Sequence, residues 1–127
     1  MHGDGQVISG SKEFMSCFPK YYLAKGGYTW NKRRRIDAVT LDDIMRNYFV
    51  PDLLVLDCEG MEYQILKSCH SMPKVVIVET HEGDIRWWHQ DWVKENIRKI
   101  DSLFVGWSKE ILDECNTRYE SSLYNKT

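Results

Sequence analysis

Two short apolar runs dominate the central part of the chain. Residues 53–57 (LLVLD) and 74–80 (KVVIVET) have the length of strands and are almost continuously hydrophobic, as in inner parallel strands covered on both faces. Between them, apolar residues recur at helical spacing over 60–70. This succession of strand, helix and strand predicts two adjacent parallel strands within a three-layer α/β core.

A helical pattern lies on each side of this unit. Thr40 is a residue type that caps helices, and Pro51 stops them, so the chain predicts a helix over 41–49. After Gly83, apolar residues again follow a helical period and predict a second amphipathic helix over 84–99. Both helices are expected to flank the sheet.

The two ends of the chain have less regular patterns. Residues 1–35 are punctuated by glycines and predict an irregular segment with one short strand at 5–9 (GQVIS). Toward the other end we expect a strand at 102–107 (SLFVGW) and a short helix at 108–119 (SKEILDECNTRY). A final strand is expected at 121–126 (SSLYNK).

Composition indicates an ordinary globular protein. The 127 residues are 43% hydrophobic and 28% charged, which fits one packed domain over 1–127. A net charge of -2 gives no general attraction to nucleic acid, although NKRRR at 31–35 is locally basic. Four cysteines without a C-x-x-C pair, together with the lack of a membrane-length apolar run or a signal peptide, predict a cytoplasmic protein.

Candidate chemistry lies where the two central strands end. Asp57 and Glu59 follow the first strand, and Glu79 and His81 follow the second. Ligands of open α/β sheets bind outside the carboxyl ends of the strands, so these four side chains are expected to converge there. They could act as general bases, or Asp57, Glu79 and His81 could hold Mg²⁺ or Mn²⁺.

A structural interpretation competes with this chemical one. Asp57 could cap the following helix, and Glu59 and Glu62 would gain from the helix dipole in its first turn. Capping does not account for Glu79, which ends a strand. Two weaker candidates are expected to be structural or exposed: the aromatic group Trp87, Trp88 and Trp92, and the histidines His2, His70 and His89.

The order of these motifs resembles one known family. VTLDDIM, PDLLVLDCEGMEYQILKSC and PKVVIVETH follow one another over residues 36–81 as in the carboxyl-terminal half of FkbM-type methyltransferases. The resemblance implies a Rossmann-like class I methyltransferase fold, incomplete at the N-terminus. It also implies transfer of a methyl group from S-adenosylmethionine to an oxygen of a small hydroxylated acceptor, commonly a sugar.

The same resemblance assigns roles to residues. It implies that Asp57 faces the methyl donor and the acceptor, and that Asp57 and Cys58 contact the cofactor. Glu59, Gly60 and Glu62 match the rest of the family's acidic motif. Glu79 and His81 match the end of the next strand, which adds them to the catalytic set.

One departure from the family leaves several interpretations open. The family's glycine-rich cofactor loop and its ribose-binding acid have no counterpart in this sequence. The chain is therefore expected to be a fragment, to obtain the missing half from a second chain or from a homo-oligomer formed through an exposed sheet edge, or to have lost methylation. A divalent-metal-dependent hydrolase or nuclease and a non-catalytic interaction module are the alternative functions.

Overall fold

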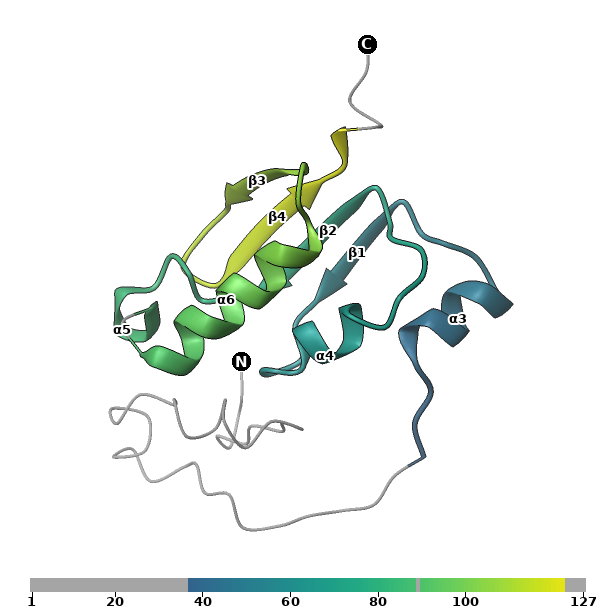
Figure 1. Cartoon of the computed structure of the whole chain (residues 1–127), viewed down its shortest axis with the longest axis horizontal. Helices are drawn as coiled ribbons and strands as arrows, with labels where there is room; N and C mark the ends of the chain where they lie inside the picture. The colour runs from purple at the N-terminus through teal and green to yellow at the C-terminus, as the bar shows by residue number, and fades with distance from the viewer. Residues whose placement is uncertain (1–36, 89, 123–127) are drawn as a thin grey trace, which may run out of the picture.

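The described part of the chain is a mixed α/β unit. The computed structural model describes residues 37–88 and 90–122, so the expected irregular segment 1–35 and the strand at 5–9 lie outside it. Figure 1 shows a sheet in the order β1-β2-β4-β3, with helices beside it. No described helix is long and apolar enough to cross a membrane.

The two central strands confirm the prediction. β1 (Leu53–Leu56) and β2 (Val75–Glu79) pair in parallel, with Leu54 opposite Val76. Their connection contains α4 (Glu62–Leu66). The acidic residues Asp57, Glu59 and Glu62 therefore follow one parallel strand, and Glu79 ends its neighbour.

Helix α3 (Leu41–Asn47) begins as its sequence predicts. The Thr40 side chain accepts a hydrogen bond of 3.0 Å from the backbone N–H of Asp43. Asp42, on the same helix, is buried and accepts the backbone N–H of His70 at 2.9 Å. The ring nitrogen Nδ1 of His70 lies 3.0 Å from the same carboxylate, so this pair ties α3 to the segment after α4.

Two predicted helices differ from the observed ones. The helix expected over 60–70 is the shorter α4, because the preceding loop contains two residues with positive φ. The helix expected over 84–99 is divided into α5 (Ile85–Trp88) and α6 (Asp91–Leu103). Gln90 has an extended backbone (φ -79°, ψ 135°), which ends one helix and caps the next.

The prediction for residues 102–119 is wrong. The expected strand at 102–107 is the end of α6 and a turn, in which Gly106 has φ 84°. The expected helix at 108–119 is an antiparallel hairpin of β3 (Ser108–Ile111) and β4 (Asn116–Glu120). Asp113 closes this hairpin by accepting the backbone N–H groups of Cys115 and Asn116 at 2.9 and 2.8 Å.

The strand expected at 121–126 is not seen in the described part. β4 ends at Glu120, two residues short of the last described position, and residues 123–127 are not described. β4 pairs with β2 in antiparallel fashion, with Asn116 opposite Glu79. The hairpin thus borders the end of β2.

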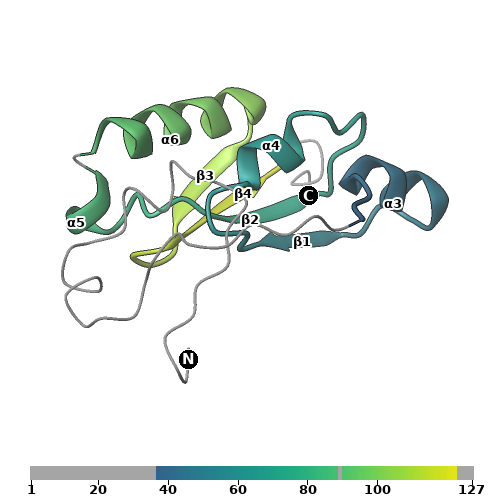
Figure 2. The same ribbon diagram turned by 90° about the horizontal axis from the view of Figure 1, so that it is seen from below.

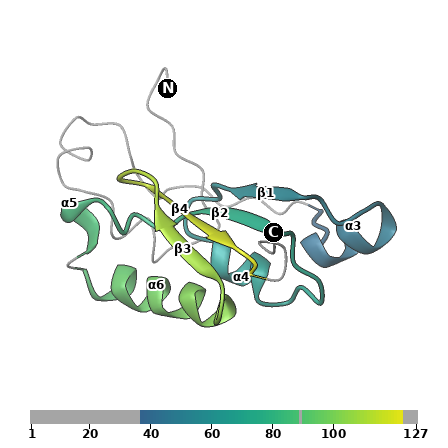
Figure 3. The ribbon, with the colours of Figure 1, turned by 90° about the horizontal axis from the view of Figure 1, so that it is seen from above.

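The hydrophobic core lies between the sheet and two helices. Figures 2 and 3 show α4 and α6 on the same side of the sheet. Phe104 at the end of α6 stacks on Tyr119 of β4, with ring centroids 4.3 Å apart. The buried cluster consists of Leu56, Leu66, Val76, Val78, Ile100, Phe104 and Tyr119.

The other face of the sheet is more open within the described residues. Leu53 and Val55 of the edge strand β1 are 51% and 58% exposed. Described residues therefore form two layers, and the third layer of the predicted α/β core stays a prediction.

Candidate active site

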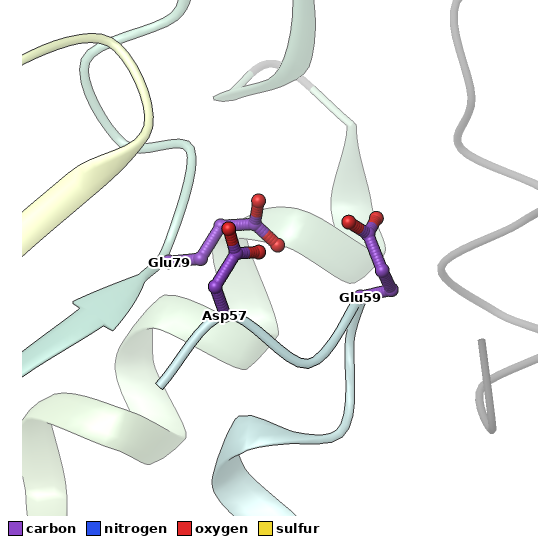
Figure 4. A group of neighbouring side chains, drawn as sticks. All are labelled: Asp57, Glu59 and Glu79. Atoms are coloured by element: carbon purple, nitrogen blue, oxygen red, sulfur yellow. The ribbon is translucent and has the colours of Figure 1, made fainter. Parts of the chain in front are cut away.

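Two carboxyl groups meet at the carboxyl edge of β1 and β2. Leu56 lies opposite Val78 in the parallel register, so Asp57 and Glu79 occupy the next positions of the two strands. Glu59 in the following loop joins them. One carboxylate oxygen from each of the three residues lies within 4.8 Å of the other two, and Figure 4 shows the three groups turned to the same side.

The loop that carries Glu59 has an unusual backbone. Glu59 has φ 50° and Gly60 has φ 99°, a region that favours glycine and strains other residues. The Glu62 carboxylate holds this loop by accepting the backbone N–H of Gly60 at 3.2 Å and that of Cys58. Glu62 is 1% exposed, so it anchors the loop from inside.

The capping interpretation of Asp57 and Glu59 is wrong. The N-cap of α4 is Met61, and no side chain makes a capping hydrogen bond to this helix. Asp57 is exposed, which leaves its carboxylate accessible. The group that serves the backbone here is Glu62. It lies in the first turn of α4, where the sequence predicted it to gain from the helix dipole, and it also accepts two N–H groups of the preceding loop.

Glu79 is a buried acid in a negative environment. Its exposed fraction is 9%, and Oε1 has no hydrogen-bond partner among the described residues. Burial, together with Asp57 and Glu59, holds the pKa of Glu79 far above its usual range. Two full charges 4.8 Å apart would repel by about 3 kcal/mol at an effective dielectric constant of about 20. Metal-free Glu79 therefore carries a proton at neutral pH.

His81 lies beside Glu79 but outside the trio of carboxylates. Its Nε2 is 3.5 Å from Glu79 Oε2. Burial lowers the pKa of His81, so the imidazole is neutral at neutral pH. The sequence suggested Asp57, Glu79 and His81 as metal ligands. The group whose oxygens lie within 4.8 Å of one another instead contains Glu59 and lacks His81.

The hairpin holds the His81 loop in place. His81 has φ 59°, and its backbone N–H and that of Thr80 both donate to the Cys115 carbonyl, at 3.0 and 2.8 Å. A Cβ on Gly83 would lie 2.5 Å from the Asp113 carbonyl oxygen, so the hairpin turn and this loop touch closely. Sequence reasoning missed this support because it predicted a helix over 108–119.

Cys58 offers little to a ligand. Its backbone N–H donates to Glu62, and its side chain packs against the core cluster. Burial and the nearby Glu62 raise the pKa of the Cys58 thiol, which leaves it protonated and unreactive. Cys69 and Cys115 are also free thiols.

Several other candidates from the sequence are not placed at this site. The side chains of Trp87 and Trp88 lie outside the described residues, as do His2, His89 and the basic cluster 31–35. His70 belongs to the contact with Asp42. The chemistry of the described site therefore rests on carboxyl groups and one neutral imidazole, a set suited to accepting a proton or binding a hard cation.

Comparison with known proteins gives one match. A family model described as "Methyltransferase FkbM domain" matches residues 8–119. The matched range includes both central strands, the acidic loop and β4 up to Tyr119. No curated protein and no solved structure matches the chain.

Proposed function

Because this chain belongs to the FkbM methyltransferase family, we propose that it serves the transfer of a methyl group from S-adenosylmethionine to an oxygen of a hydroxylated small molecule, such as a sugar. The observation that carries this proposal is the meeting of Asp57 and Glu79 at the end of adjacent parallel strands. Ligands of open α/β sheets bind at this edge.

The three acidic residues and His81 have different environments and hence different roles. Asp57 is exposed and can accept the proton of an acceptor hydroxyl. Glu79 is buried behind it and holds a proton, so it can donate a hydrogen bond to Asp57 or to the acceptor. The neutral His81 contacts Glu79, and Glu59 borders the same space.

The reaction balances with these groups. The acceptor oxygen forms a bond to the methyl carbon while the bond from that carbon to the sulfonium sulfur breaks. The electron pair of the broken bond stays on sulfur, which becomes a neutral thioether. The hydroxyl proton passes to the Asp57 carboxylate and then to water.

Asp57 is better placed than Cys58 to contact the cofactor. Asp57 presents an exposed carboxylate, whereas the Cys58 backbone N–H is engaged with Glu62. The sequence has no G-x-G-x-x-G motif that would cradle the cofactor. A second chain, or a second copy paired along the edge strand β1, would then supply further contacts.

The free thiols are consistent with the reducing cytoplasm.

Label transfer tests this function. The full chain is incubated with methyl-labelled S-adenosylmethionine at several millimolar and a panel of sugars and small alcohols. We expect transfer by the wild type and a loss of about 100-fold or more in Asp57→Asn, since general base catalysis contributes that much. Asp52→Asn is the matched control, because Asp52 is 89% exposed and precedes β1 at its other end.

Two outcomes would contradict the proposal. The first is equal transfer by the wild type and Asp57→Asn. The second is no transfer to any acceptor by the wild type, even at millimolar cofactor. Circular dichroism of each variant establishes that the fold is unchanged.

A further inference from the structure

We propose that Asp57, Glu59 and Glu79 together bind one hard divalent cation at the carboxyl edge of β1 and β2. The three residues come from two strand ends and one loop. One carboxylate oxygen of each lies within 4.8 Å of the other two. The ion would sit among these oxygens, on the side to which Figure 4 shows all three groups turned.

The spacing of the oxygens fits a single ion. Two oxygens on one ion are at most about twice the metal–oxygen distance apart, roughly 4.2 Å for Mg²⁺ and about 4.8 Å for Ca²⁺. The observed limit of 4.8 Å lies within the range for Ca²⁺ and requires a small closure for Mg²⁺. Carboxylate oxygens without thiolate or imidazole favour Mg²⁺, Mn²⁺ and Ca²⁺ over Zn²⁺.

A buried, unpartnered atom gives independent support. Glu79 is 9% exposed, and its Oε1 lacks a hydrogen-bond partner among the described residues. Buried polar atoms normally have a partner, and one that has no partner within the protein often contacts an ion or a water molecule. Described contacts give the Glu79 side chain the imidazole of His81 and the carboxylate of Asp57, but no lysine or arginine. A cation next to Asp57 and Glu59 would satisfy this oxygen.

The loop is built so that Glu59 reaches the other two acids. Its positive φ of 50° is retained because Glu62 accepts the backbone N–H groups of Cys58 and Gly60. Glu62 uses its oxygens for this purpose and lies outside the trio. Glu62 thus anchors the loop, which leaves the carboxylates of Asp57, Glu59 and Glu79 to bind the ion.

The ion suggests a class of acceptor. Three protein oxygens leave about three positions open on a six-coordinate ion. Neighbouring open positions favour an acceptor with two adjacent oxygens, such as a vicinal diol of a sugar, whose hydroxyl would become more acidic on the ion. This choice of acceptor rests on the proposed methyl transfer, whereas ion binding does not.

Manganese binding tests the site without any cofactor or acceptor. The full chain is titrated with Mn²⁺, and the resonance signal of free aqueous Mn²⁺ measures the unbound ion. We expect one ion per chain, displaced by excess Mg²⁺ or Ca²⁺. Affinity should fall at least tenfold in Asp57→Asn, Glu59→Gln and Glu79→Gln, and stay within twofold in Asp52→Asn, whose side chain lies at the opposite end of β1.

Each result decides the proposal. Absence of binding at millimolar Mn²⁺ would overturn it, as would equal binding by the wild type and Glu79→Gln. Glu79→Gln removes a buried acid and should fold, which a thermal melt in chelator checks. Methyl transfer plays no part in this measurement, so a chain that binds Mn²⁺ but transfers no methyl group would contradict the proposed function alone.

Discussion

The buried carboxylate of Glu62 accepts the backbone N–H of Gly60 at 3.2 Å, and this hydrogen bond fixes the loop in which Glu59 has φ 50°. A second N–H, from Cys58, donates to the same side chain. The loop could take other conformations without these bonds. Glu62 is therefore the residue that positions Glu59 beside Asp57.

Glu62→Ala should lower the free energy of unfolding by about 2–4 kcal/mol. The variant leaves two inward-facing N–H groups without acceptors, each costing about 1–3 kcal/mol, although relief of the buried charge offsets part of this loss. Denaturant unfolding followed by circular dichroism measures the change. Glu110→Ala, at an exposed site on β3, should stay within about 0.5 kcal/mol, and equal losses in both variants would contradict the anchoring role.

Glu79 should make the metal-free protein less stable as the pH rises. Burial and the hydrogen bond with Asp57 raise the pKa of Glu79 from 4.5 to about 10. An acid whose pKa is raised by folding gives its full contribution below the unfolded pKa and loses it as the pH approaches the folded pKa. In chelator, the free energy of unfolding should fall between pH 5 and 9 by at most about 1.4 kcal/mol per unit.

Variants separate this effect from other titrations. Glu79→Gln should flatten the slope and be more stable than the wild type at pH 8, because the amide carries no charge to bury. Asp57→Asn should make the fall smaller and end it at a lower pH, because the hydrogen bond and the negative charge of Asp57 both raise the pKa of Glu79. Asp52→Asn should show the same dependence of the free energy of unfolding on pH as the wild type. If Glu79→Gln also keeps that dependence, groups other than Glu79 cause it and the prediction is wrong.

Apolar pattern and strand-end position predicted the centre of the fold well. β1 and β2 are recognisable because their residues are continuously hydrophobic, and Thr40 marks the start of α3 by its own side chain. Asp57 and Glu79 could be paired because parallel strands bring their carboxyl ends to one edge. These features depend on local sequence and on a general rule of topology.

The remaining features depend on contacts between distant segments. Ile97, Ile100 and Phe104 continue the helical spacing of α6, so its extension to Leu103 is visible in the sequence, although the predicted helix ends at 99 and the predicted strand begins at 102. The hairpin depends on the Asp113 turn and on pairing with β2. The approach of Glu59 to Asp57 depends on two positive φ values held by Glu62, which no periodicity reveals.

Gly83→Ala should loosen the loop that carries His81. The added Cβ would lie 2.5 Å from the Asp113 carbonyl oxygen, so the hairpin turn must move away. The hydrogen bonds from Thr80 and His81 to the Cys115 carbonyl should then weaken. Amide hydrogen exchange should become faster at these two residues, with a loss of about 1–3 kcal/mol in stability.

Gly106→Ala is the matched control for this substitution. A Cβ at Gly106 would meet no described atom within 4 Å, although its φ of 84° disfavours alanine. It should cost about 1–2 kcal/mol and leave exchange at Thr80 and His81 unchanged relative to the rest of the sheet. Equal acceleration in both variants would show that the close contact does not hold the loop.

The chain by itself should bind S-adenosylmethionine weakly. Tight binding of such a cofactor uses backbone N–H groups of a glycine-rich loop, and the sequence contains no G-x-G-x-x-G motif. Asp57 alone offers one exposed carboxylate, so we expect a Kd of about 1 mM or weaker, near -4 kcal/mol. Isothermal titration with S-adenosylmethionine and S-adenosylhomocysteine measures it, and light scattering at the same concentration gives the number of chains. A micromolar Kd in a monomer would contradict this prediction and assign the missing contacts to this chain, whereas a micromolar Kd that appears with a dimer would assign them to its partner.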